Sequence, residues 1–258
     1  MHATTQFLPS FDGAELAVHR LGPVEGGRPL LLLHGLFSSA EINWIKYGTA
    51  ARLAEAGFAC IMPDLRAHGQ SAAPHDAAAY PPDVLVRDLV ALVGGLGLTD
   101  YDLGGFSLGA RTALGGVISG GLAPRRLVLG GMGLGGLRGW SGRLDFFLDV
   151  IDRFGTIGRE DPAYMSQNFL RSTKVDRVAA RLLLECLGRG AAVAAARDFA
   201  GVTMPTLLVC GTDDHDNGSA QDLASALPDG RYAPIPGNHM TSVTKPELAA
   251  AIAGFLRG

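Results

Sequence analysis

Short apolar runs alternate along this chain with longer stretches of helical periodicity. Five of the runs are four or five residues long, which is typical of strands buried on both faces of a parallel sheet. They lie at residues 30–33, 58–62, 101–104, 127–130 and 206–210. Because parallel neighbours need a crossover between them, this alternation predicts an α/β fold with helices on both faces of the sheet.

Three further strands bring the predicted sheet to eight. Residues 4–9 and 15–20 form a hairpin around Asp12-Gly13, a turn signal, and residues 231–235 precede the last helix. That helix is predicted to begin with a capping box at Thr244 and Glu247. The prediction is therefore a mostly parallel eight-stranded sheet with an antiparallel edge.

The alternation stops between residues 133 and 200, where helical segments follow one another without a convincing strand. We interpret residues 133–200 as a helical lid or cap inserted after the sixth strand, with residues 1–132 and 201–258 forming the core. Ligands of α/β sheets bind at the carboxyl edge of the strands, and the lid is expected to lie over that edge.

Ser107 lies in Gly105-Phe106-Ser107-Leu108-Gly109, between a predicted strand and a predicted helix. A serine in such a sharp turn is raised above the sheet edge, where a base can reach its hydroxyl, and the glycines allow the close packing that the turn needs. Glycine makes up 36 of 258 residues, so the pattern alone is weak. Its position between strand and helix makes Ser107 a candidate nucleophile.

A serine nucleophile needs a base and a group that orients the base. His239 follows the last predicted strand, so a loop holds it at the sheet edge. Asp214 follows the strand before it, 25 positions earlier, and Asp213 is the adjacent alternative. The order serine, aspartate, histidine suits a triad of Ser107, Asp214 and His239.

The tetrahedral oxyanion needs two backbone donors. One is expected to be the N–H of Leu108, directly after the nucleophile, and the other the N–H of Leu36, in the loop after the strand at 30–33. His34 opens that loop and is expected to brace it rather than to serve as the base.

The chain resembles members of the α/β-hydrolase fold superfamily over essentially its whole length. The residues that carry the resemblance are His34-Gly35, Asp64-Leu65-Arg66-Ala67-His68-Gly69-Gln70-Ser71, Gly105–Gly109, Gly211–Asp214, and His239 with Lys245-Pro246-Glu247. Ala67 stands where such proteins usually have glycine, and Asn238 separates Gly237 from His239. These departures remove no catalytic group, but because of them the substrate of any one subfamily cannot be assumed for this chain.

The resemblance implies a hydrolase without a cofactor. Epoxide hydrolases and haloalkane dehalogenases of this fold use an aspartate nucleophile, whereas this chain has Ser107 in that place. The expected function is therefore a serine esterase or lactonase (a carboxylesterase-like enzyme of class EC 3.1.1) that cleaves a small, largely apolar ester or lactone. The alternatives are a carbon–carbon bond hydrolase of a ring-cleavage diketone, a perhydrolase or acyltransferase, and a non-catalytic sensor of a small ligand.

Several other patterns have competing interpretations. Residues 131–136 match a dinucleotide-binding glycine motif, but no helix follows at once, so no dinucleotide is expected there. Residues 213–216 (Asp-Asp-His-Asp) resemble a metal cluster, but successive side chains alternate in direction and cannot all face one ion, so no metal is expected. Arg66, His68 and Arg111 are expected to make structural contacts, with binding of a substrate carboxylate as the alternative. Large apolar residues expected in the core or lid, some of them as walls of a substrate pocket, are Phe37, Trp44, Met132, Trp140, Phe146, Phe147 and Met240.

Composition fits this interpretation. Apolar residues make up 47% of the chain, charged residues 18%, and the net charge is −3, so neither disorder nor nucleic-acid binding is expected. The N-terminal residues lack the features of a signal peptide, no apolar run approaches the length of a membrane span, and Cys60, Cys186 and Cys210 are expected to be free thiols. A cytoplasmic location follows as the expectation, with the oligomeric state left open.

Overall fold

The computed structural model describes residues 2–23, 25–137, 141–189 and 196–258. Its strands are β1 (Thr4–Pro9), β2 (Glu15–Leu21), β3 (Arg28–Leu33), β4 (Phe58–Pro63), β5 (Asp102–Phe106), β6 (Leu127–Gly130), β7 (Thr206–Gly211) and β8 (Gly230–Ile235). They form one sheet in the order β1-β2-β4-β3-β5-β6-β7-β8. Strands β3 to β8 are parallel, and the β1–β2 hairpin adds an antiparallel edge, which confirms the predicted fold class.

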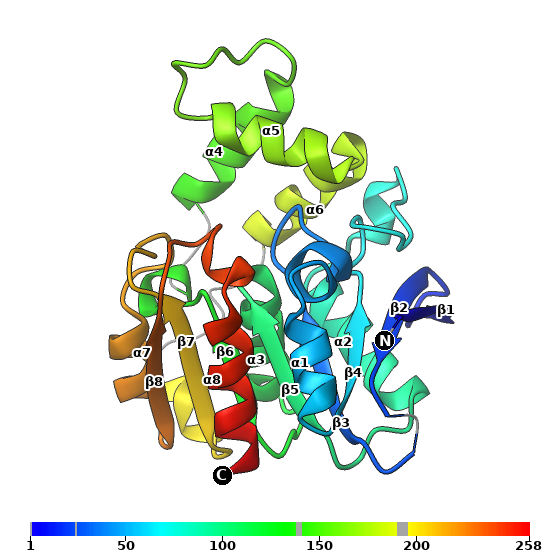
Figure 1. Cartoon of the computed structure of the whole chain (residues 1–258). Helices are drawn as coiled ribbons and strands as arrows, with labels where there is room; N and C mark the ends of the chain where they lie inside the picture. Colours follow the sequence, from blue (N-terminus) through cyan, green and yellow to red (C-terminus); the bar gives the residue numbers. More distant parts are fainter. Residues whose placement is uncertain (1, 24, 138–140, 190–195) are drawn as a thin grey trace.

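Helices cover both faces of this sheet (Figure 1). The helices of the core are α1 (Thr49–Glu55), α2 (Val84–Gly95), α3 (Leu108–Ile118), α7 (Ala220–Ala226) and α8 (Pro246–Arg257). Helices α1 and α8 pack together on one face, while α2, α3 and α7 lie on the other. The chain also contains short helical turns: η1 (Glu41–Ile45), η2 (Ala77–Ala79), η3 (Leu134–Leu137), η4 (Ala196–Gly201) and η5 (Ser242–Thr244).

The apolar run in β3 shows how the sequence builds two cores from one strand. Leu30 and Leu32 pack with the residues of α1 and α8, and Leu31 and Leu33 pack with those of α2 and α3. All four are completely buried. Burial of each leucine contributes about 1.5–3 kcal/mol, so a strand that is apolar on both faces belongs in the middle of the sheet.

A helical insertion lies between β6 and β7, beyond the carboxyl ends of the parallel strands (Figure 1). It contains α4 (Ser141–Asp152), α5 (Tyr164–Thr173) and α6 (Arg177–Arg189). The insertion has an apolar cluster of its own, which includes Val150, Leu170 and Leu184 and extends to Phe37 of the core. On α6, Leu183 packs instead into the main core, so this helix joins the two clusters.

The predicted capping box of the last helix is wrong. Helix α8 begins at Pro246, and its N-cap is Lys245, which makes no side-chain capping bond. Thr244 belongs to η5, and its hydroxyl donates to the carbonyl of Thr241 at 2.8 Å. A proline forces the residue before it into an extended conformation, so the helix starts one residue later than a cap at Thr244 requires.

The three cysteines are free and buried, as the sequence predicts. Among the helices in the described ranges, none combines the length and apolar character that a membrane span requires.

Candidate active site

Ser107 occupies a strained turn between β5 and α3. Its φ of 53° and ψ of −113° lie in a region that costs a side-chain-bearing residue about 1–3 kcal/mol. The turn closes tightly, because a Cβ on Gly105 would lie 2.3 Å from the backbone of Gly109, and one on Gly109 would lie 2.5 Å from the carbonyl oxygen of Leu33. The Ser107 N–H donates to Gly130 at 2.8 Å, which fixes the turn against β6.

A hydrogen-bonded chain joins the three residues predicted as the triad. The Ser107 Oγ lies 3.0 Å from the Nε2 of His239, and the Nδ1 of His239 lies 2.9 Å from the Oδ2 of Asp214. Asp214 follows β7 and His239 follows β8, its parallel neighbour. The carboxyl ends of parallel strands meet at one edge, which is why residues 107, 214 and 239 converge there.

Asp214 is buried, with 7% of its surface exposed. Burial acts to raise the pKa of its carboxyl group, but the hydrogen bond and charge of His239 and the backbone N–H of Asp216 outweigh it and hold that pKa below its ordinary value. Cys210 also contacts Oδ2, at 3.5 Å, and burial raises the pKa of this thiol to about 12. Asp214 is therefore an ionised acceptor that holds Nδ1 of His239 in the protonated tautomer.

Asp213, the alternative acid, is exposed. Its backbone N–H donates to the carbonyl of Gly237 at 3.0 Å, which ties the loop after β7 to the loop after β8. Within the described residues, no hydrogen bond joins its carboxylate to His239. The structure thus selects Asp214 from the two candidates.

The loop after β3 lies against the nucleophile. A Cβ on Gly35 would lie 3.4 Å from the Cβ of Ser107, so the next residue, Leu36, is close to the serine. The N–H of Leu108 is in the first turn of α3, where N–H groups have no acceptor within the helix. This places both predicted oxyanion donors on segments that adjoin Ser107.

Two buried histidines brace this loop. The Nε2 of His34 accepts from the N–H of Leu65 at 2.9 Å, and the Nε2 of His68 accepts from the N–H of Phe37 at 2.9 Å. Burial lowers the pKa of both imidazoles, that of His68 to about 3, so they are neutral acceptors at physiological pH. His34 therefore braces the loop, as the sequence predicts, and has no ring nitrogen left for Ser107, since its Nδ1 bonds the carbonyl of Gly35 at 2.8 Å.

Asp64, which directly follows β4, also binds the loop after β3. Its carboxylate accepts from the backbone N–H groups of Ala40 and Gln70, each at 2.8 Å, and from the Nε2 of His19 at 3.1 Å. Burial acts to raise the pKa of Asp64, but the bonds from His19 and the two N–H groups keep it below its ordinary value. A Cβ on Gly69 would lie 2.0 Å from this carboxylate, so that glycine makes room for it.

The arginines near the site make structural contacts. Arg66 is completely buried, and its guanidinium forms paired hydrogen bonds to Asp88 and to Asp12. Arg111 donates to the carbonyl of Gly136 at 2.7 Å, and burial lowers its pKa to about 10. Arg66 is thus saturated by carboxylates of the protein itself.

The glycine motif at residues 131–136 packs against protein. A Cβ on Gly133 would lie 2.2 Å from the carbonyl oxygen of Gly218, and one on Gly136 would lie 2.7 Å from the side chain of Asn217. The chain continues into η3 rather than into an α-helix. These glycines therefore allow close contact with the loop after β7, in place of a dinucleotide.

The large apolar residues separate into distinct environments. Phe37 is buried, and the half-buried Phe147 of α4 packs edge-on against its ring at a centroid distance of 5.3 Å. Trp44 and Met132 are buried in the two cores on either face of the sheet, whereas Phe146 and Met240 are exposed. Trp140 lies outside the described residues.

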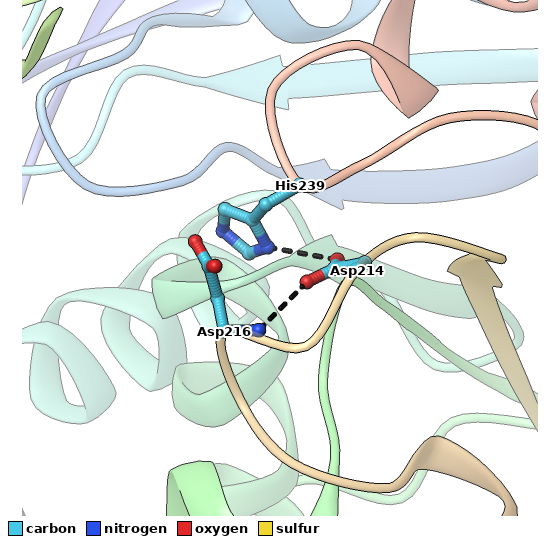
Figure 2. A group of neighbouring side chains, drawn as sticks. All are labelled: Asp214, Asp216 and His239. Carbon is cyan, nitrogen blue, oxygen red and sulfur yellow. Dashed lines mark hydrogen bonds and ion pairs between the residues drawn. The ribbon is translucent and has the colours of Figure 1, made fainter.

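The sequence places Asp216 only in the metal-like run Asp213–Asp216 and does not predict its position beside His239. One ligand atom of each of Asp214, Asp216 and His239 lies within 4.8 Å of the other two (Figure 2). No signal in the sequence predicts this approach, because both aspartates lie in the loop between β7 and α7, whose path a local pattern does not fix. Since Nδ1 of His239 and Oδ2 of Asp214 are bonded to each other, we assign these two residues to the hydrogen-bonded chain rather than to a metal.

The comparisons with known proteins identify the family of the chain. Residues 30–252 match the family described as "Alpha/beta hydrolase family". The chain belongs to this family. An esterase from Exiguobacterium antarcticum has a similar structure, with a TM-score of 0.78 and 21% identity over 99% of this chain and 100% of that one.

Two curated relatives match parts of the chain. An epoxide hydrolase of Caballeronia sordidicola is 34% identical over 102 residues, which are 40% of this chain and 29% of that protein. An N-formylmaleamate deformylase of Pseudomonas putida is 33% identical over 134 residues, which are 51% of this chain and 48% of that protein. The matches thus span less than half the length of either relative.

We expect Gly109→Ala to destabilise the protein by at least about 2 kcal/mol, because the added methyl group would overlap backbone carbonyl oxygens that have no room to move. Gly94→Ala is the matched control, since nothing lies within 4 Å of its Cβ position on an exposed part of α2. It should stabilise by about 0.5–1 kcal/mol. Urea unfolding measures both, and equal effects would contradict the tight turn.

Asp64→Asn should lower the free energy of unfolding by about 3–5 kcal/mol at neutral pH. The amide places an N–H donor against a backbone N–H and removes a buried charge from its donors. The pKa of Asp64 is lowered in the folded state, so its contribution is present above the unfolded value and is lost as pH falls through the folded value. Urea unfolding of both proteins should therefore show a difference that shrinks below about pH 4. A difference that is constant with pH would contradict this role.

Proposed function

We propose that this protein is a serine hydrolase that cleaves small, largely apolar carboxylic esters or lactones through an acyl-enzyme on Ser107. The observation that carries the proposal is the hydrogen-bonded chain from Ser107 Oγ to His239 at 3.0 Å and from His239 to Asp214 at 2.9 Å. A hydroxyl is a weak nucleophile at neutral pH, and an imidazole within hydrogen-bond distance is what activates it.

The reaction follows from the roles these positions allow. Ser107 attacks the carbonyl carbon while His239 takes its proton, and the ionised Asp214 stabilises the imidazolium that forms. The N–H groups of Leu36 and Leu108 hold the oxyanion. His239 then protonates the leaving alcohol, and a water molecule activated by the same imidazole releases the acid.

The choice of acyl chemistry rests on the nucleophile. A serine forms an ester with a carbonyl substrate, and this ester is hydrolysed by attack at the same carbon. Opening an epoxide, the reaction in the name of one relative, would instead leave a serine ether, which water does not cleave readily. Deformylation, the reaction in the name of the other relative, removes a formyl group, which is an acyl group, and is therefore compatible with a serine nucleophile.

The preference for an apolar substrate rests on the aromatic contact beside Leu36. Phe37 and Phe147 bring two rings together next to the proposed oxyanion donor, and they join the core to the insertion. We propose that residues 133–200 act as a lid whose apolar side chains contact the substrate. Hydrolysis of a formamide is the second candidate, favoured by the deformylase match alone.

Purified protein should hydrolyse p-nitrophenyl esters of short acyl chains, and Ser107→Ala should lower kcat by at least about 10³-fold without loss of folding. A fluorophosphonate should label the wild-type protein and leave the Ser107→Ala variant unlabelled. Formate release from an N-formyl substrate tests the second candidate. Absence of both turnover and labelling in folded wild-type protein would refute the serine mechanism.

Asp214→Asn should lower kcat by about 10³–10⁴-fold, because an amide no longer accepts from Nδ1 and the imidazole is held in the wrong tautomer. Asp213→Asn removes the same charge from the adjacent, exposed position and should change kcat by less than about twofold. Steady-state kinetics of the two variants decides between the neighbours. Equal losses would mean that charge, rather than the bond to His239, is what matters.

A further inference from the structure

The carboxylate of Asp216 is a second negative charge beside the imidazole of His239. One oxygen of Asp216 lies within 4.8 Å of a ring nitrogen of His239 and of an oxygen of Asp214. Figure 2 shows the two carboxylates approaching the ring from different sides. Asp214 is buried, whereas Asp216 is exposed at the edge of the site.

The backbone around Asp216 is held in place. Its N–H donates to the Oδ1 of Asp214 at 3.2 Å, and its carbonyl accepts from Arg143 of α4 at 2.7 Å. The next residue, Asn217, donates from its side chain to the carbonyl of Gly131 at 2.6 Å. Within the described residues, by contrast, the Asp216 carboxylate itself takes part in no hydrogen bond or ion pair, so it has no structural partner there that would explain its position.

We propose that Asp216 is a positioning residue for the hydrolase, and that its negative charge stabilises the imidazolium of His239 that forms when Ser107 loses its proton. The inference rests on the proposed function of Ser107. A charge about 5 Å from a cation at a protein surface lowers its free energy appreciably, and salt screens this attraction. Asp214 fixes the direction of the ring, and Asp216 adds charge without a direct bond.

The other groups around His239 do not supply this charge. Cys210 is a neutral thiol on Asp214, Phe106 presents its ring at a centroid distance of 5.1 Å, and Ser107 is the proton donor. Arg143, on the insertion, brings a positive charge to the same loop and opposes Asp216. The net effect on the imidazolium therefore depends on Asp216 being ionised.

The test compares Asp216→Asn with Asp213→Asn, which removes an equal charge from an exposed neighbour in the same loop. A neutral p-nitrophenyl ester is the substrate, so that neither carboxylate acts on substrate charge. The readouts are kcat/KM against pH and the rate of fluorophosphonate labelling of Ser107. Both are measured at about 0.01 M and about 1 M salt, where the screening length falls from about 30 Å to about 3 Å.

Asp216→Asn should lower the plateau of kcat/KM and the labelling rate about 3- to 10-fold at low salt. Its acid limb should move to lower pH by about half to one unit, because the imidazolium has lost a stabilising charge. At high salt the two proteins should converge. Asp213→Asn should stay within about twofold of the wild type throughout.

An Asp216→Asn profile that coincides with that of Asp213→Asn overturns the inference and leaves the serine mechanism intact. A uniform loss with an unmoved acid limb and no dependence on salt also overturns it, because that result indicates a structural effect. Wild-type protein that shows neither turnover nor labelling refutes the proposed function, and the inference then fails with it.

Discussion

The close approach of backbone to backbone around Ser107 is the constraint on which the active-site edge depends. Helix α3 starts against the end of β3, and the contact leaves no space for a side chain at Gly105 or Gly109. The strain at Ser107, with its positive φ, is sustained by this packing and by the bond of its N–H to β6. The loop that carries Leu36 can adjoin the serine only because the strand and helix approach so closely.

Around this turn, buried polar groups give each loop a single position. Asp64 gathers two backbone N–H groups and His19, while the neutral His34 and His68 accept N–H groups that would otherwise be unpaired. Buried donors and acceptors must be satisfied, so these networks tolerate few alternative arrangements. They hold the proposed oxyanion donors without contributing any catalytic group themselves.

The contrast between Asp214 and Asp216 illustrates how one loop can present two carboxylates in different environments. Asp214 is buried and bonded to His239, so its effect on the imidazole is direct and directional. Asp216 lies near the ring in contact with solvent, and its influence is through charge alone. Because Arg143 of the insertion holds the carbonyl of Asp216, the position of this second charge is coupled to the insertion.

The sequence by itself determined the strands, the parallel sheet and the candidates Ser107, Asp214 and His239, because periodicity and turn residues are local signals. It failed at Thr244, where Pro246 moved the helix start, and it left Asp213 open as the alternative to Asp214. Only the tertiary structure distinguished the two aspartates, brought Asp216 to His239 and joined Phe147 to Phe37. These outcomes depend on which loops meet at the sheet edge. Contacts between residues far apart in the sequence cannot be predicted from local periodicity or turn residues.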